Sequence, residues 1–246
     1  MENPIGIILA AIAAGVFWLV ARRILAARRN PGNALVKTGR AFEEQGRYRE
    51  AAKCYQSAER EFRRLADTAG LAKALFLQGL ISKCNEKYDQ SMEFFLEAAE
   101  LCRKIKDNES LGHDFMCMGE AQEEQARYKK AAYYFSEAVE LWRELKMPDQ
   151  YAYGHFRLGS VFAKQDKNEE ALASFEKAGK VYKRQLNFES SSQIYIEKAV
   201  CKAKMGERDA ALADYREAEK ILRRVGVKEG AAEMRKRIQE LEASEE

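Results

Sequence analysis

Proline is scarce in this chain of 246 residues, and its scarcity limits the possible folds. Three prolines occur, at positions 4, 31 and 148, and no stretch rich in proline, glycine and serine separates one region from another. Proline disrupts helix interiors because it lacks a backbone N–H and its ring clashes with the preceding turn. The composition therefore favours long helices joined by short turns, and it argues against domains separated by a flexible linker.

Net charge is also small once the first residues are set aside. The chain has 42 Lys and Arg against 39 Asp and Glu, and residues 1–29 hold four of the basic residues and one of the acidic ones. Residues 30–246 are left with 38 of each sign. A nucleic-acid-binding domain usually shows a strongly positive charge or a basic stripe. The sequence therefore predicts no nucleic-acid partner.

Residues that could carry catalysis or hold a metal are few and scattered. The two histidines, His113 and His155, lack a cluster of further ligands; Cys117 follows His113 at helical spacing, but two ligands do not make a zinc site. The sequence has no glycine-rich phosphate loop, GxSxG or HExxH motif. We therefore predict that the protein is not an enzyme and takes no cofactor, no metal and no small-molecule substrate.

The cysteines form no recognisable framework. There are five, at positions 54, 84, 102, 117 and 201, with no CxxC motif and no paired spacing. Each stands beside apolar residues in a pattern of helical type, where cysteine behaves as a small buried hydrophobe. The sequence predicts free thiols in a reducing compartment rather than a set of disulfides.

The first thirty residues contain a long apolar run. Residues 4–21 provide 18 uncharged positions, which at about 1.5 Å each span roughly 27 Å as a helix, close to the hydrocarbon thickness of a bilayer. A cleaved signal peptide would carry its basic residues before the apolar run, whereas here they follow it. We predict an uncleaved transmembrane anchor in residues 1–29, with residues 4–21 in the bilayer.

The charges that flank this run predict its orientation. One acidic residue, Glu2, precedes the run, and four arginines follow it. The positive-inside rule then places the N-terminus outside and everything after residue 22 in the cytoplasm. Residues 30–33 are predicted to form a short turn, and small residues within the run leave open whether anchor helices associate. The predicted contacts to lipid headgroups are Arg22, Arg23, Arg28 and Arg29.

A pattern with a period of forty residues runs through the rest of the chain. Its first column holds Gly39, Gly79, Gly119, Gly159 and Ala199. Twelve residues later come Ala51, Ser91, Ala131, Ala171 and Ala211; four further come Tyr55, Phe95, Phe135, Phe175 and Tyr215; three further come Ala58, Ala98, Ala138, Ala178 and Ala218. Spacings of three and four put residues on one helix face. We expect two antiparallel helices per repeat, closely packed at the small residues, with the aromatic ring between successive repeats and the repeats stacked.

This pattern resembles the tetratricopeptide repeat (TPR) family over about residues 33–225. The family's usual repeat has about 34 residues; the longer repeat here looks like the extended versions found in kinesin light chains and cell-polarity scaffolds. The family's closing proline is absent. The resemblance implies an all-α fold: an α-solenoid of five helix-turn-helix repeats plus a C-terminal capping helix, preceded by one transmembrane helix. We expect the added residues to lengthen the second helix, to about 18 residues, and the turn after it.

The period also predicts boundaries. The five repeats are expected at about 34–66, 70–106, 109–146, 148–186 and 188–226. First helices are expected at roughly 34–45, 70–85, 109–125, 149–165 and 189–205, and second helices at 48–65, 88–105, 128–145, 168–185 and 208–225. Asp67, Asp107 and Asn187 suit the turns between repeats, and Pro148 suits a first helical turn. Residues 227–246 are expected to form a capping helix and acidic tail, with Val227, Ala231, Met234, Ile238 and Leu241 as its apolar stripe.

The resemblance also implies a binding site, because the family binds partners in a concave groove lined by the first helices. An apolar trail within the implied groove would accept an amphipathic helix or an extended segment with apolar anchors. The alternative interpretation is that these side chains pack between neighbouring first helices or under the C-terminal helix. The implied groove residues are Arg40, Lys73, Phe76, Leu80, Lys83, Met116, Glu120, Tyr153, Phe156, Ser160, Ile196 and Val200.

We therefore predict a membrane-anchored TPR adaptor or scaffold that binds protein partners at the cytoplasmic face of a membrane, for assembly or stabilisation of a membrane protein complex. Two alternatives remain open: an organelle import or targeting receptor, and a regulatory subunit that recruits an enzyme to the membrane. A receptor for chaperone tails is not among them. Residues that form the two-carboxylate clamp of such receptors are replaced here by Val36, Arg40, Leu77, His113 and Cys117.

Overall fold

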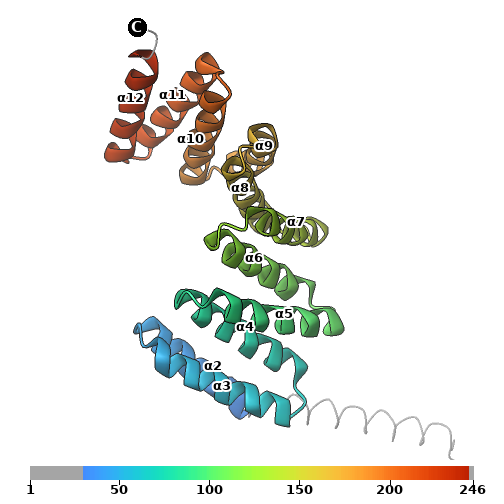
Figure 1. The fold of residues 1–246 in the computed structure, drawn as a ribbon. Coiled ribbons are helices and arrows are strands. Elements are labelled where there is room, and N and C mark those ends of the chain that lie inside the picture. Colours follow the sequence, from blue (N-terminus) through green and yellow to red (C-terminus); the bar gives the residue numbers. More distant parts are fainter. Residues whose placement is uncertain (1–29, 244–246) are drawn as a thin grey trace, which may run out of the picture. The chain divides into compact units, whose positions relative to one another are not determined.

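The computed structural model describes residues 30–243, and every regular element in that range is an α-helix (Figure 1). The helices form stacked hairpins, as the predicted solenoid requires. The eleven described helices are α2 (Pro31–Glu44), α3 (Tyr48–Arg64), α4 (Thr68–Cys84), α5 (Tyr88–Ile105), α6 (Asn108–Glu124), α7 (Tyr128–Glu144), α8 (Pro148–Lys164), α9 (Asn168–Arg184), α10 (Phe188–Lys204), α11 (Arg208–Arg224) and α12 (Lys228–Ala243).

From α3 onward the helices are nearly equal in length, at 16 to 18 residues. The first helix α8 and the second helix α9 both have 17 residues, and α5 has 18. Three residues join each helix to the next, both within a hairpin and between hairpins, except that two residues join α5 to α6. The turn after the second helix is therefore no longer than the turn before it, contrary to the expectation of a lengthened turn.

The three-residue loops share one backbone geometry. In the loop after α2, the amide of Arg47 donates to the carbonyl of Phe42 at 2.8 Å. The corresponding hydrogen bond, from the amide of one residue to the carbonyl five residues earlier, closes each of the other loops between residues 44 and 228. This bond is that of a Schellman motif, whose central residue is left-handed. The central residues have φ between 51° and 81°, although most of them are not glycine: Gly46, Ala66, Glu86, Lys106, Ala126, Lys146, Asp166, Leu186, Gly206 and Gly226.

Several helix starts follow the predicted chemistry. Asp107 caps α6 by accepting a hydrogen bond from the amide of Ser110, and Asn187 caps α10 in the same way through Ser190. Pro148 stands in the first turn of α8. The segment predicted as a turn, residues 30–33, instead holds the cap and first residues of α2, because Asn30 accepts from the amide of Gly32 and Pro31 begins the helix.

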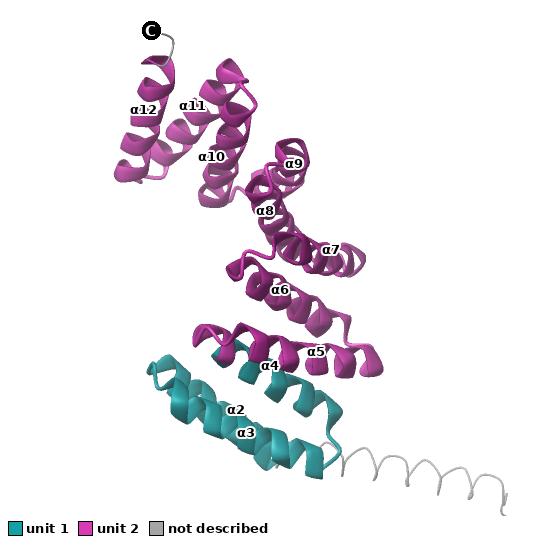
Figure 2. Ribbon diagram, in the orientation of Figure 1, with its two compact units in different colours: residues 1–81 teal, residues 82–246 magenta. Residues whose placement is uncertain are grey.

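The chain divides into two compact units, residues 1–81 and residues 82–246 (Figure 2). The first unit ends at Ile81, and its described part holds α2, α3 and most of α4. Tyr55 and Phe62 of α3 are its largest buried side chains. Asn30 donates to the carboxylate of Asp67 at 2.9 Å, and this bond joins the start of α2 to the loop before α4.

The second compact unit, residues 82–246, repeats one packing arrangement along its hairpins. A Cβ added to Gly119 of α6 would lie 2.5 Å from Cδ1 of Phe135, and one added to Gly159 of α8 would lie 2.7 Å from Cε1 of Phe175. Each ring therefore lies on the glycine of its own hairpin. This contact explains why the first column must be small, and Phe175 also packs in one cluster with Ile194 and Cys201 of α10, in the following hairpin.

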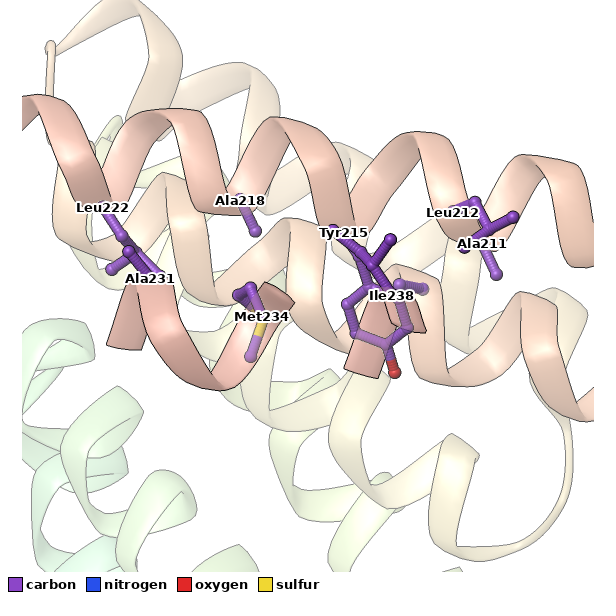
Figure 3. Packing of buried hydrophobic residues seen from close by; sticks show 9 residues of the cluster. Ala211, Leu212, Tyr215, Ala218, Leu222, Ala231, Met234 and Ile238 are labelled. Carbon is purple, nitrogen blue, oxygen red and sulfur yellow. The ribbon is translucent and has the colours of Figure 1, made fainter. Parts of the chain in front are cut away.

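The C-terminal helix α12 covers the last hairpin (Figure 3). Ala231, Met234 and Ile238 of α12 are buried in a cluster with residues of α11, and Leu241 is partly buried against it. Val227, the first member of the predicted apolar stripe, is 46% exposed in the preceding loop. The α11 side of the cluster consists of Ala211, Leu212, Tyr215, Ala218 and Leu222.

None of the helices within residues 30–243 is long and apolar enough to cross a membrane. Helix α3, for example, is amphipathic: it buries Ala51, Tyr55, Ala58 and Phe62 on one face and carries charged residues elsewhere. This finding overturns the prediction of a single-pass membrane protein with its N-terminus outside and its repeats in the cytoplasm. The predicted anchor in residues 4–21, and the predicted headgroup contacts Arg22, Arg23, Arg28 and Arg29, lie outside the described residues.

Candidate partner-binding site

The implied groove residues fall in both compact units. In the first unit, Arg40 of α2 and Lys73 of α4 are exposed, while Phe76 and Leu80 of α4 are half-buried. The remaining groove residues lie in the second unit, on α6, α8 and α10 and at the end of α4, where Lys83 stands. The candidate site described below therefore consists of residues of the second unit alone.

The apolar members of the groove set in the second unit are largely engaged by their neighbours. Met116 is 4% exposed, and its terminal methyl group lies near Gly154 of α8. Phe156 packs against the core around Phe175, and Ile196 and Val200 pack against the cluster under α12. These placements match the alternative interpretation, in which the apolar trail contributes to packing. Tyr153 differs, because it is 41% exposed, and Ser160 is half-buried.

A network of charged side chains occupies the space between the apolar members. Its centre is Glu120 of α6, whose Oε2 accepts from Nζ of Lys83 and whose Oε1 accepts from Nη1 of Arg157 at 2.7 Å. The hydroxyl of Tyr153 lies 3.3 Å from the same Oε1 and 2.9 Å from Nη1 of Arg157. One carboxylate thus ties the end of α4 to α6 and α8.

A second carboxylate extends the network along α6. Glu123 is buried, and its Oε2 accepts from Nη2 of Arg157 at 2.6 Å, while its Oε1 accepts from Nζ of Lys164 at 2.8 Å. The guanidinium of Arg157 also lies 5.2 Å from the ring centre of Phe135. We call Lys83, Glu120, Glu123, Tyr153, Arg157 and Lys164 the inner-face network.

The protonation states of the network are held by its contacts. Burial alone would raise the pKa of Glu120, but the hydrogen bond from Lys83 and the charges of Lys83 and Arg157 leave that pKa below its usual value. Burial likewise opposes the charged form of Arg157, yet the hydrogen bond to Glu123 raises its pKa. Glu120 and Arg157 therefore stay charged throughout the neutral range, and the network is fixed in place.

Lys83, Glu120 and Tyr153 of this network belong to the implied groove set, whereas Arg157, which joins them, does not. A signal for Arg157 exists in the spacing: Lys83 and Glu120 are 37 residues apart, as are Glu120 and Arg157. Opposite charges at this interval, close to the repeat period, face each other across adjacent first helices. Searching at that interval would have found the pairs.

Little in the described part of the chain resembles a reactive centre. No group of three or more potential metal ligands occurs within residues 30–243. Burial raises the pKa of the Cys117 thiol, which lies beside the network, to about 12, so that the thiolate is absent at neutral pH. The arrangement can position donors and acceptors for a partner, and it offers no activated nucleophile.

Comparison with known protein families supports the repeat fold. A family described as soluble NSF attachment protein, SNAP, matches residues 149–245, and a family described as tetratricopeptide repeat matches residues 33–63. Each match covers less than half of the chain. No curated protein matches the sequence. Both families agree with a TPR-like repeat protein.

Solved structures show the same fold at low identity. BtubC (BKLC) from P. vanneervenii shares 18% identity with a TM-score of 0.73, over 91% of this chain and 93% of that one. A putative kinesin light chain from Podosopora anserina with nearly identical TPR-like repeats shares 12%, with a TM-score of 0.68, over 80% and 97%. A Rap protein complexed with competence and sporulation factor shares 14%, with a TM-score of 0.57, over 85% and 74%. At these identities the likeness establishes the fold alone: a TPR-like α-solenoid.

Proposed function

We propose that this chain is a non-enzymatic adaptor that binds a segment of a partner protein along the inner face of α6 and α8. The observation that carries the proposal is the inner-face network, which fixes polar side chains of three successive first helices beside the exposed ring of Tyr153. Side chains held in place by mutual hydrogen bonds lose little entropy when a partner binds. Such a surface suits recognition rather than catalysis.

The network also indicates what kind of segment would bind. It contains three cations, Lys83, Arg157 and Lys164, and two carboxylates, Glu120 and Glu123, which leaves one positive charge in excess. Each lysine has three N–H donors and uses one on its carboxylate. We expect the free donors to take carbonyl or carboxylate oxygens of an extended peptide, with an apolar side chain against Tyr153.

Structural neighbours agree with a peptide or protein as the partner. The Rap protein of similar fold was solved in complex with the competence and sporulation factor, and solenoids built from helical hairpins commonly present extended binding surfaces. In this proposal the chain brings proteins together and supports assembly of a complex, rather than transforming a substrate.

Two exposed tyrosines allow a matched test of this proposal. Tyr153 lies in the inner-face network, whereas Tyr133 of α7, which is 57% exposed, lies on a second helix. A photo-crosslinking amino acid is placed at each position in the source cells, and crosslinked proteins are identified by mass spectrometry. We expect a protein that crosslinks at position 153 and not at 133.

The affinity of that protein then provides the second measurement. Tyr153→Ala should weaken binding of the crosslinked protein at least tenfold in calorimetry, while Tyr133→Ala should leave the affinity unchanged. Both variants should keep the thermal unfolding midpoint of the wild type, because both side chains are exposed. Equal crosslinking at the two positions, or equal affinity of both variants, would reject the inner face as the binding surface.

A further inference from the structure

A hollow of about 570 Å³ opens between α9, α10 and α11 of the second compact unit. Its floor is apolar: Phe175 and Gly179 of α9 face Ile194 and Tyr195 of α10, and Ile221 of α11 closes the far wall. Leu186, in the loop between α9 and α10, stands at its margin and is 69% exposed. Pockets of this size commonly hold apolar groups of a ligand.

Two facing residues change places beside the hollow. In the preceding hairpin, Val139 and Trp142 of α7 are buried, and Val139 lies so close to α8 that a Cβ on Gly154 would be 2.7 Å from its Cγ2. Forty residues later the glycine is on α9 and the bulky residue on α10, and a Cβ added to Gly179 would lie 3.2 Å from Cγ2 of Ile194. Gly179 therefore leaves room for Ile194, and no side chain extends from position 179 into the hollow that it lines.

This hollow is separate from the inner-face network. On α10, residues 191, 194, 195 and 198 line the hollow and share one helix face by their spacings of three and four. The groove positions Ile196 and Val200 lie roughly 180° around the same helix, given about 100° per residue. A partner in the hollow and a partner on the inner face would therefore approach the chain from different sides.

The rim of the hollow is positively charged. It carries five basic and two acidic residues: Lys180, Lys183, Lys198, Lys220, Arg224, Glu176 and Glu217. Lys220 pairs with Glu217 at 3.2 Å, and Lys198 lies 4.0 Å from Asp214. No ion pair within residues 30–243 joins Lys180, Lys183 or Arg224 to a carboxylate, and the guanidinium of Arg224 lies 4.8 Å from the ring centre of Phe188. Cations without a carboxylate partner therefore line the hollow from both α9 and α11.

We propose that this hollow docks an acidic amphipathic helix of a partner protein, with the apolar side chains of that helix on the half-buried Tyr195 and Ile221. Charge complementarity selects this occupant: an anionic group is needed on each wall, which carboxylates on both edges of a helix supply and a single lipid headgroup does not. Helix-in-groove docking places apolar anchors three and four residues apart, and the exposed Leu186 extends the contact beyond the hollow.

Selection from a random peptide library tests the proposal without a known partner. Phage-displayed 16-residue peptides are selected on the full chain and counter-selected on the Gly179→Val variant, which carries the valine of the preceding repeat. We expect enriched peptides with apolar residues at helical spacing flanked by Asp or Glu. Their synthetic forms should bind the wild type at least tenfold more tightly than Gly179→Val in fluorescence anisotropy.

Charge variants give an independent measurement. Lys180→Glu combined with Lys183→Glu should weaken the same peptides at least tenfold, whereas Lys129→Glu combined with Lys130→Glu, on exposed lysines of α7, should not. The thermal midpoint of Gly179→Val is measured as a control, because a Cβ at that position already lies 3.2 Å from Cγ2 of Ile194. Where this variant loses stability, the lysine pair decides the outcome.

Several results would overturn the proposal. The proposal is rejected if no enriched peptide binds the wild type more tightly than Gly179→Val. It is also rejected if the enriched peptides are basic. Self-association in sedimentation equilibrium that Gly179→Val abolishes would assign the hollow to a second copy of the chain, and tight binding of fluorescent palmitate that the same variant abolishes would assign it to a lipid. The Tyr153→Ala variant should bind the selected peptides normally, so that failure here is distinguishable from failure of the inner-face proposal.

Discussion

Asp114 of α6 shows how one buried carboxyl group sets a pH dependence. It is 1% exposed, and its Oδ2 has no hydrogen-bond partner within the described residues. Burial raises its pKa to about 8, the charge of Asp107 adds to the rise, and a hydrogen bond from Cys102 partly opposes it. The carboxyl group is therefore protonated in the folded chain at neutral pH, and ionised in the unfolded chain above about pH 4.

A raised carboxyl pKa makes stability fall as pH rises. Between about pH 4 and 8 the folded chain holds a proton that the unfolded chain has lost, so this group lowers the free energy of unfolding by up to roughly 1.4 kcal/mol per pH unit. Asp114→Asn should remove that slope in urea unfolding measured from pH 4.5 to 8.5. Asp209→Asn, at an exposed aspartate, should follow the wild type. A variant Asp114→Asn with an unchanged slope would contradict the assignment.

His155 of α8 has the opposite effect. It is 4% exposed, its Nδ1 has no partner within the described residues, and burial lowers its pKa to about 4. Because the unfolded chain binds a proton below about pH 6.5 and the folded chain does not, stability contributed by this group is lost as pH falls from 6.5 to 4.

Replacing His155 by the residue of the preceding repeat tests this effect. Phe115 holds the equivalent position on α6 and is buried. On acidification from pH 7.5 to 5.0, the thermal unfolding midpoint of His155→Phe should fall less than that of the wild type. The reason is that phenylalanine has no titratable group at this position. The slopes of Asp114 and His155 oppose each other between pH 4 and 6.5, so each effect is measured as the difference between a variant and the wild type.

At the scale of a helical pair, two glycines with different surroundings make a matched comparison. A methyl group on Gly119 would lie 2.5 Å from Cδ1 of the buried Phe135, whereas one on Gly179 would meet Ile194 at 3.2 Å. Gly119→Ala should destabilise by about 1–3 kcal/mol, as overpacking of a core does. Gly179→Ala should be neutral or stabilising, because alanine favours the helix by about 1 kcal/mol. Urea unfolding of both variants is the measurement; equal costs would refute the distinction.

The helices could be predicted well from the sequence, because the columns of small and aromatic residues mark which faces must meet. Ala131, Phe135 and Ala138 of α7 are all buried, as that pattern requires. The loops were harder to foresee. A left-handed central residue usually signals glycine, yet Lys106 and Leu186 adopt it. The left-handed conformation costs about 1–2 kcal/mol at each residue other than glycine. The hydrogen bond that closes the loop and the packing of the flanking helices outweigh this cost.

The candidate sites were predicted less well, for a physical reason. The period determines positions that pack within a hairpin, while the inner-face network depends on which charges stand opposite each other on neighbouring hairpins, as Glu120 and Arg157 do. The hollow beside α10 likewise depends on a facing pair, because Gly179 faces Ile194 where the preceding repeat has Val139 facing Gly154. A single column read along the chain does not contain either relation.

At the scale of the molecule, α12 closes a surface that the hairpins leave open. It covers Tyr215 and Leu222 of α11, which are 6% and 7% exposed (Figure 3). Deletion of residues 228–246 would expose this apolar face, and stability in stacked repeats depends on contacts with neighbours. We expect hydrogen exchange of α11 amides to accelerate at least tenfold, with little change in α6. Unchanged exchange in α11 would show that the last hairpin is stable without its cover.

The three-residue loops have a consequence for how such a chain can change length. Each loop in residues 82–243 is closed by the same backbone hydrogen bond. Deleting forty residues, from one loop to the loop at the same position in the next hairpin, therefore joins two helices whose connecting loop keeps its geometry. Circular dichroism should show the shortened chain folded, whereas removal of twenty residues would put a second helix where a first helix belongs and lower the helical signal. Gene duplication can therefore add or remove whole hairpins, and with them binding surfaces, without any junction having to evolve anew.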